Sequence, residues 1–139
     1  MNDPMSAHAR ESYEAFASFY DEFNHRYLYR TWTATLLARA EAAGLPGRRL
    51  LDVACGTGLS SVTPLECGFE VTGTDISPAM LARARARLGV GTDLIVADMR
   101  TLPVLGEFDL VWAVNGPLNY LLGLDELVAS LLAMRRNLA

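Results

Sequence analysis

Hydrophobic side chains follow one spacing up to about residue 46 and another after it. In the first part, apolar and aromatic residues recur every three to four positions, which predicts helices over 12–21 and 29–43. A Gly-Leu-Pro sequence closes the second of these helices. Its buried face is expected to carry four apolar side chains, Trp32, Leu36, Leu37 and Ala40.

After residue 46, short apolar runs alternate with helical patterns. The runs predict four strands, over 49–54, 70–74, 93–97 and 108–114. Helices are expected to end near Cys67, with Pro64 kinking or shortening that helix, and near Leu88. A last helix over 124–138 is expected to bury Leu127, Leu131, Leu132 and Met134. Strands that are apolar on both faces indicate an α/β fold with a mostly parallel sheet covered on both sides.

Composition narrows the class of protein. The chain has 139 residues, 51% hydrophobic and 20% charged, which is typical of one globular domain. Its net charge is −4 and all 12 basic residues are arginine, so neither a dedicated nucleic-acid surface nor an anionic membrane surface is expected. Two cysteines and two histidines are too few for a usual zinc site, so no metal is expected. A cytoplasmic location is the default expectation, since neither a signal peptide nor an apolar run of about 18 residues is present.

The stretch LDVACGTGLSS over 51–61 follows a predicted strand and opens a helix. Gly56 and Gly58 allow the backbone to turn sharply and to approach a ligand closely. The helix that follows presents unpaired N–H groups to polar or anionic groups. A plain strand-to-helix turn is the alternative interpretation of this stretch.

Asp75 ends the second predicted strand, seventeen residues after Gly58. In a doubly wound sheet this strand ends beside the glycine turn, where a carboxylate can accept hydrogen bonds from both hydroxyls of a ribose. A ligand that contains a nucleoside is therefore expected. The alternative is that Asp75 only caps the helix that begins at Ser77.

Two residues bear on the identity of that nucleoside. A nicotinamide-dinucleotide site favours a third glycine where Ser61 stands, and an apolar first strand where Asp52 stands. An acid at Asp52 suits a ligand that carries a cationic amine. Three arginines spaced by two, Arg83, Arg85 and Arg87, are expected to form a solvated helix face and not a phosphate site.

Together these stretches resemble the class I S-adenosylmethionine-dependent methyltransferases of the small-molecule type, which have a Rossmann-like fold. LLDVACGTG resembles the first motif of that family, which implies that Asp52, Ala54, Gly56 and Gly58 surround the methionine part of the cofactor. VTGTDISPAML resembles the second motif. It implies that Asp75 binds the ribose hydroxyls, and that Ile76 and Met80 lie against the adenosine.

The resemblance continues toward the C-terminus. LIVADMRTLP implies that Asp98 accepts from the adenine amino group and that the Met99 backbone contacts the ring. FDLVWAVNGPLNYL implies that Val114 and Asn115 face the sulfonium and the acceptor entrance. The segment 1–46 would form a helical lid, with Tyr20 and Trp32 near the cofactor, over a core formed by 47–139.

The resemblance implies a strand order 3-2-1-4 and further strands after the fourth. The chain is therefore expected to be part of a longer fold that stops where the turn after the last helix begins, leaving the fourth strand at a bare edge. Such an edge invites a homo-oligomer. The expected activity is S-adenosylmethionine-dependent methyl transfer to a small molecule. An NAD-type oxidoreductase domain and a non-catalytic cofactor-binding fragment are the alternatives.

No catalytic residue is assigned, and the acceptor atom is left open between nitrogen, oxygen and carbon. An oxygen or carbon acceptor would benefit from a general base. His25 and Tyr120 are the candidates for that base, and Asn115 and Asn119 are candidates for orienting the acceptor.

Overall fold

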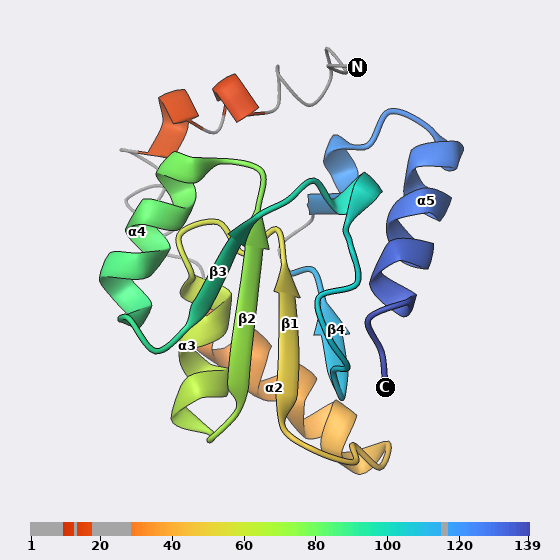
Figure 1. Cartoon of the computed structure of the whole chain (residues 1–139). Helices are drawn as coiled ribbons and strands as arrows, with labels where there is room; N and C mark the ends of the chain where they lie inside the picture. Colours follow the sequence, from red (N-terminus) through yellow and green to blue (C-terminus); the bar gives the residue numbers. More distant parts are fainter. Residues whose placement is uncertain (1–9, 13, 18–28, 115–116) are drawn as a thin grey trace.

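Four parallel strands form one twisted sheet in the computed structural model, which describes residues 10–12, 14–17, 29–114 and 117–139 (Figure 1). The strands are β1 (Arg49–Val53), β2 (Glu70–Asp75), β3 (Asp93–Val96) and β4 (Leu110–Trp112). Their order is β3-β2-β1-β4, and every pairing is parallel. The expected α/β class and strand order are confirmed.

Helices alternate with these strands and cover both faces of the sheet. They are α2 (Tyr29–Ala42), α3 (Leu59–Glu66), α4 (Pro78–Leu88) and α5 (Leu124–Arg135), with short 3₁₀ turns η1 (Met99–Thr101) and η2 (Pro117–Tyr120). α3 contains Pro64 and ends one residue before the predicted end at Cys67. Within the part of the chain that the structure describes, no helix has the length and apolar character needed to cross a bilayer.

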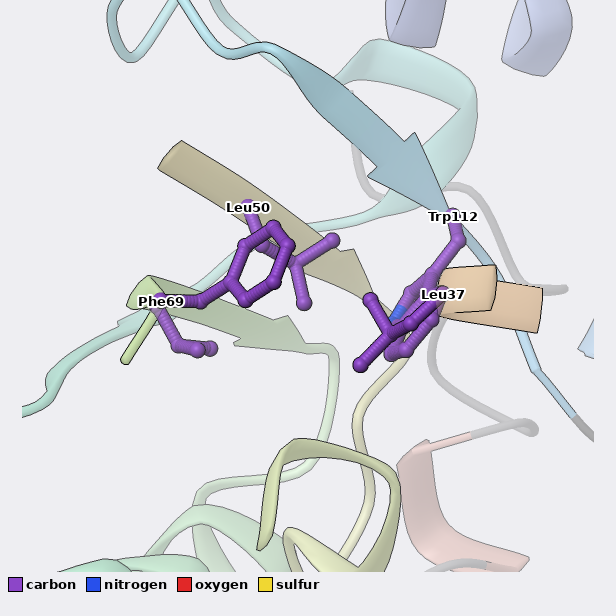
Figure 2. Close-up of a cluster of buried hydrophobic side chains, with 5 residues drawn as sticks. Leu37, Leu50, Phe69 and Trp112 are labelled. Atoms are coloured by element: carbon purple, nitrogen blue, oxygen red, sulfur yellow. The ribbon is translucent and has the colours of Figure 1, made fainter. Parts of the chain in front are cut away.

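Successive side chains of β1 point into two separate hydrophobic clusters. Leu50 packs with Leu37 of α2, Phe69, Val71 and Trp112 on one face, where Figure 2 shows Leu37 beside the Trp112 indole. The other cluster, under α5 and η1, consists of Leu51, Val53, Leu102, Phe108 and Ala133. β1 is thus buried on both sides, which accounts for its nearly continuous apolar sequence.

The buried face of α2 differs from the expectation. Tyr29, Thr33 and Leu37 are buried, whereas Trp32 is 45% exposed and Leu36 41% exposed. The helix can turn Thr33 inward because its hydroxyl donates to the Tyr29 carbonyl at 2.6 Å, so no polar group is left unpaired. The predicted grouping of Trp32 and Leu36 with Leu37 is therefore wrong.

α5 also presents a different face to the sheet and ends earlier than predicted. Its buried side chains are Ser130 and Ala133, and Leu131 and Leu132 are 47% and 48% exposed. Small side chains let the helix lie close to the strands, which the larger leucines would prevent. The helix ends at Arg135, before the predicted residue 138.

The segment after α5 has already turned back toward β4. Phe108 N donates to Asn137 O at 2.8 Å and Ala139 N donates to Phe108 O at 2.9 Å, in a parallel bridge between Phe108 and Leu138. The expectation that the chain stops where this turn begins is wrong. The fourth strand is regular only over Leu110–Trp112, and the isolated bridge at Phe108 lies two residues before it.

Asn137 makes this turn possible without a glycine or proline. Its side chain is fully buried, and its Oδ1 accepts from Leu105 N at 2.7 Å. Its Nδ2 donates to Pro103 O and to Ala133 O, both at 3.1 Å. One side chain therefore fastens the end of α5 to the segment before β4.

Candidate functional site

The predicted site residues follow the carboxyl ends of the strands. The glycine turn follows β1, Asp75 ends β2, Asp98 comes after β3 and Val114 after β4. In a parallel sheet these ends share one edge, and the strand order reverses its direction between β1 and β4, where such folds bind ligands. The helical pieces 10–12 and 14–17 lie at the same edge (Figure 1).

The turn after β1 has an unusual backbone. Ala54, Gly56 and Gly58 all have positive φ angles, of 55°, 56° and 85°. Ala54 is the one non-glycine residue with positive φ in the described part of the chain, and such conformations concentrate at functional sites. A Cβ on Gly58 would lie 2.9 Å from Leu88 Cδ1, so the absence of a side chain at Gly58 also lets α4 pack against the turn.

Asp75 and the glycine turn are in direct contact. Gly56 N donates to Asp75 Oδ2 at 2.9 Å, and Ser77 N donates to Asp75 Oδ1 at 2.9 Å. The Asp75 side chain is nearly buried, and burial raises its pKa although these backbone amides act to lower it. The cap of α4 is Ser77 itself, whose hydroxyl accepts from Met80 N at 3.2 Å. Asp75 is therefore not the residue that caps α4.

Asp52 is fully buried beneath the start of α3. Its Oδ2 accepts from the hydroxyls of Ser60 and Ser61, both at 2.6 Å, so Ser61 fills the position of a third glycine with a hydrogen-bond donor. Burial raises the Asp52 pKa from 3.8 to about 6, while both serines and the nearby Trp112 indole lower it and the Asp75 charge raises it. Within the described residues, neither Asp52 Oδ1 nor Trp112 Nε1 has a partner in hydrogen-bond geometry.

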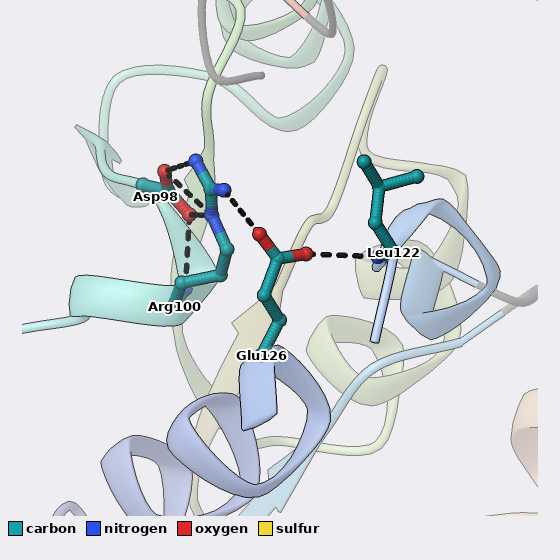
Figure 3. A network of polar contacts seen from close by, with 4 residues as sticks. All are labelled: Asp98, Arg100, Leu122 and Glu126. Atoms are coloured by element: carbon teal, nitrogen blue, oxygen red, sulfur yellow. Dashed lines mark hydrogen bonds and ion pairs between the residues drawn. The ribbon is translucent and has the colours of Figure 1, made fainter. Parts of the chain in front are cut away.

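Asp98 lies beside an arginine that the sequence had not indicated. Arg100 donates to it from its backbone N at 2.9 Å, from Nε at 3.1 and 3.2 Å and from Nη2 at 2.8 Å (Figure 3). Nη1 of Arg100 donates to Glu126 Oε1 at 2.8 Å. A bidentate contact of this kind fixes the orientation of the carboxylate.

A second arginine, on α4, holds the glycine turn. Arg87 Nη1 donates to the Thr57 carbonyl at 2.6 Å and to the Thr57 hydroxyl at 2.9 Å. Arg85 Nη1 donates to the carbonyls of Gly89 and Thr92, at the end of the same helix. Arg87 is exposed, as expected for a solvated face, whereas Arg83 and Arg85 are half-buried. The spacing of the arginines does not predict these contacts, because the Arg85 and Arg87 side chains bind backbone carbonyls, which every residue carries.

The other predicted residues are spread over the same edge. Ile76 is half-buried directly after β2, Met80 is fully buried in the first turn of α4, and Val114 packs on the cluster around Leu50. Met99 lies in η1 with its side chain against the cluster around Leu51.

Some predicted residues lie outside the described part of the chain or at the surface. Tyr20, His25 and Asn115 fall outside the described residues, as does the side chain of Asn119. Trp32 is half-exposed, and Tyr120 in η2 is 57% exposed. Their predicted roles stay predictions.

The cysteines and acids do not gather into a metal-binding group among the residues described. Cys55, in the glycine turn, is buried, and Cys67 is exposed; neither forms a disulfide. Burial, together with the charges of Asp52 and Asp75, raises the pKa of the Cys55 thiol well above its usual value. A thiol in this state is a poor nucleophile.

The sheet order 3-2-1-4 and the glycine turn bonded to the acid at the next strand end form the arrangement predicted for a ligand that contains a nucleoside. Residues 50–139 match the family model described as a methyltransferase domain. The chain belongs to this methyltransferase family. The match favours the methyltransferase interpretation of the glycine turn over the alternative of an NAD-type oxidoreductase.

Individual methyltransferases resemble the chain in sequence and in structure. A Bacillus subtilis (strain 168) protein, YqeM, named provisionally as a methyltransferase, is 39% identical over 112 residues, which cover 78% of this chain and 44% of YqeM. A ubiquinone biosynthesis O-methyltransferase of Pseudomonas aeruginosa (strain LESB58) is 40% identical over 76 residues, covering 51% of this chain and 33% of the relative.

A solved methyltransferase structure resembles this chain over most of the chain's length. CalS10, an amino pentose methyltransferase from Micromonospora echinaspora with S-adenosylmethionine bound, has a TM-score of 0.77 and 36% identity. The superposition covers 85% of this chain and 50% of CalS10. The chain spans half the length or less of these three methyltransferases.

Proposed function

We propose that this protein binds S-adenosylmethionine and transfers its methyl group to a small-molecule acceptor. The observation that carries the proposal is the hydrogen bond from Gly56 N to Asp75 Oδ2 in a chain of the methyltransferase family. It joins the backbone turn that would wrap the methionine part to the carboxylate that would bind the ribose.

The residues present suit the chemical groups of this cofactor. A carboxylate has about four acceptor positions. The two backbone amides on Asp75 leave one position on each oxygen for the two ribose hydroxyls. Asp52 adds a buried anionic oxygen without a described partner, which suits a cationic amine. The first turn of α3 has no side-chain cap, and Ser61 N donates to Gly58 O at 3.1 Å, so the amides of Leu59 and Ser60 are the ones that would meet polar groups of a ligand.

The proposed mechanism depends on positioning. Bound S-adenosylmethionine supplies a methyl group that its positive sulfur already activates. Asp75 and the glycine turn would hold the two ends of the cofactor, and the segment after β4 would form the acceptor side. Alignment of this kind can supply about 7–11 kcal/mol of the barrier reduction. His25 and Tyr120 remain the candidates for a base.

The acceptor class and the location are part of the proposal. An amino sugar enzyme and a ubiquinone biosynthesis enzyme among the similar proteins support a small-molecule acceptor, with nitrogen and oxygen both open. The acidic composition, with net charge −4, favours a small molecule over nucleic acid. Two cysteines that form no disulfide fit a cytoplasmic enzyme.

Calorimetric titration of the chain with S-adenosylmethionine and with NAD tests the cofactor. We expect heat with S-adenosylmethionine only, and heat with NAD alone would refute the proposal. Asp75→Asn should raise the dissociation constant by at least about tenfold, since each charge-assisted hydrogen bond contributes about 1.5–3 kcal/mol.

Asp93→Asn is the matched control for that variant. Asp93 is an exposed acid at the opposite end of β3, so its loss should leave binding unchanged. Circular dichroism shows whether both variants are folded. Equal affinity of folded Asp75→Asn and the unaltered chain would contradict the role of Asp75.

A further inference from the structure

Arg100 connects two parts of the edge that come from distant positions in the sequence. On one side it holds Asp98, after β3, and on the other it binds Glu126, in the first turn of α5. Glu126 Oε2 in turn accepts from Leu122 N at 2.8 Å, as Figure 3 shows. The loop before α5 is thereby tied to the segment after β3.

Burial makes these contacts stronger than surface ion pairs. The Arg100, Asp98 and Glu126 side chains are 12%, 18% and 28% exposed. Charges in partly buried positions are less screened than those in water. α5 also packs directly on η1, which carries Arg100, so packing and charge act on the same pair of elements.

Under the proposed function, the Asp98 end of this chain of contacts faces the cofactor, and the Leu122 end lies in the loop before α5. Asp98 is the predicted acceptor for the adenine amino group. Leu122 belongs to the loop between η2 and α5. A ligand that orders one end should therefore order the other, because Asp98 binds the Arg100 guanidinium directly and Leu122 is linked to it through Glu126.

We propose that Arg100 and Glu126 are positioning residues that couple occupancy of the adenine side to the order of the loop before α5. The inference rests on the proposed function. Neither side chain needs to touch the reacting atoms. Arg100 would orient the Asp98 carboxylate, and Glu126 would transmit that orientation to the Leu122 backbone.

Two measurements on the full chain test the coupling. Calorimetry with S-adenosylhomocysteine gives affinity, and hydrogen exchange gives the protection of the Leu122 amide with and without this ligand. In the unaltered chain we expect the ligand to slow exchange at Leu122 by about tenfold, a typical size for coupling between two sites.

Glu126→Gln and Arg100→Lys weaken the two contacts while keeping similar shapes. Glutamine retains an oxygen for Leu122 N but loses the charge, and lysine retains the charge but loses the bidentate geometry. Each should weaken ligand binding by about threefold to tenfold and abolish the ligand-induced protection at Leu122. The matched controls are Asp125→Asn, an exposed acid in the same turn of α5, and Arg39→Lys, an exposed arginine on α2.

The outcomes separate this inference from the proposed function. No binding by the unaltered chain would overturn both. Binding with unchanged affinity and unchanged Leu122 protection in Glu126→Gln would overturn the coupling and leave the proposed function intact. Loss of protection in Glu126→Gln, with normal protection in Asp125→Asn, is the result that supports it.

Discussion

At the scale of single residues, Asp52 lies in a buried environment that disfavours its ionised form, but two serine hydroxyls donate hydrogen bonds to it. Its carboxylate is fully buried, and Ser60 and Ser61 stabilise one of its two oxygens. Because its pKa is raised in the folded state, to about 6, the folded chain keeps a proton there at pH values where the unfolded chain has lost it. An ionised Asp52 therefore lowers the free energy of unfolding at neutral pH.

The sign of this effect gives a testable pH dependence. The contribution of Asp52 to the free energy of unfolding should fall as pH rises from about 4 to about 6, by about 3 kcal/mol at about 1.4 kcal/mol per pH unit. Asp52→Asn cannot ionise, so its stability relative to the unaltered chain should increase over that range. Urea unfolding at pH 4.5 and at pH 7.5 measures the difference, with Asp93→Asn as the control. A stability difference independent of pH would contradict the assignment.

The candidate site could be predicted only where a backbone requirement is visible in the sequence. Gly56 and Asp75 were identified because turn geometry and strand ends constrain residue type, and the structure places them in contact. The serines that hold Asp52 and the arginine that holds Asp98 were not identified. Their contacts depend on side-chain directions in the folded chain, and a sequence pattern does not specify those directions.

At the scale of elements, the end of α5 depends on one polar side chain. Asn137 joins Leu105, Pro103 and Ala133 through three hydrogen bonds, while its own carbonyl accepts from Phe108 N. This network stands where a glycine or a proline commonly ends a helix. A buried amide can take that place because it has both donors and acceptors.

Asn137→Ala should therefore destabilise the fold by about 1–3 kcal/mol, because it removes three hydrogen bonds and leaves partly buried backbone groups without these partners. Thermal unfolding followed by circular dichroism measures this. Arg136→Ala, at the exposed neighbouring position, should change the midpoint little. Asn137→Asp keeps the acceptor for Leu105 N but places carboxylate oxygens against two carbonyl oxygens in a fully buried site, so an effect at least as large is expected. Equal midpoints for Asn137→Ala and Arg136→Ala would contradict the network.

Helix positions were predictable, but their buried faces were less so. The spacing of apolar residues located α2 and α5 within a few residues. It failed to select the inward side, because Thr33 satisfies its own hydroxyl and because Ser130 and Ala133 permit close packing. A prediction from hydrophobicity alone buries Leu36 of α2 and Leu131 and Leu132 of α5, all of which are exposed.

At the scale of the whole molecule, the order of the strands follows from the alternating pattern and the family resemblance, and it is confirmed. Neither the alternating pattern nor the family resemblance predicts which apolar side chains are exposed. Leu124, Val128, Leu131 and Leu132 are all at least 46% exposed, and their spacing places them on one side of α5. Contiguous apolar surface of this kind commonly marks a site of association.

The apolar side of α5 is therefore a second candidate surface for the predicted homo-oligomer, beside the edge of β4. Light scattering during size-exclusion chromatography should show a mass that increases with concentration. Leu131→Glu should shift the population toward monomer by placing a charge in the contact. Ala129→Glu, on the flank of the same helix, is the control. A monomeric mass for the unaltered chain at all concentrations would refute this expectation.

The contact between Gly56 and Asp75 has a consequence for selectivity. The carboxylate is held from two sides before any ligand arrives, so binding of a sugar would require almost no loss of rotamer freedom. Under the proposed function, a 2′-deoxy or 3′-deoxy analogue would meet an acceptor that cannot relax to compensate for the missing hydroxyl. Discrimination against deoxynucleosides would then be built into the resting conformation and would not require a closing motion.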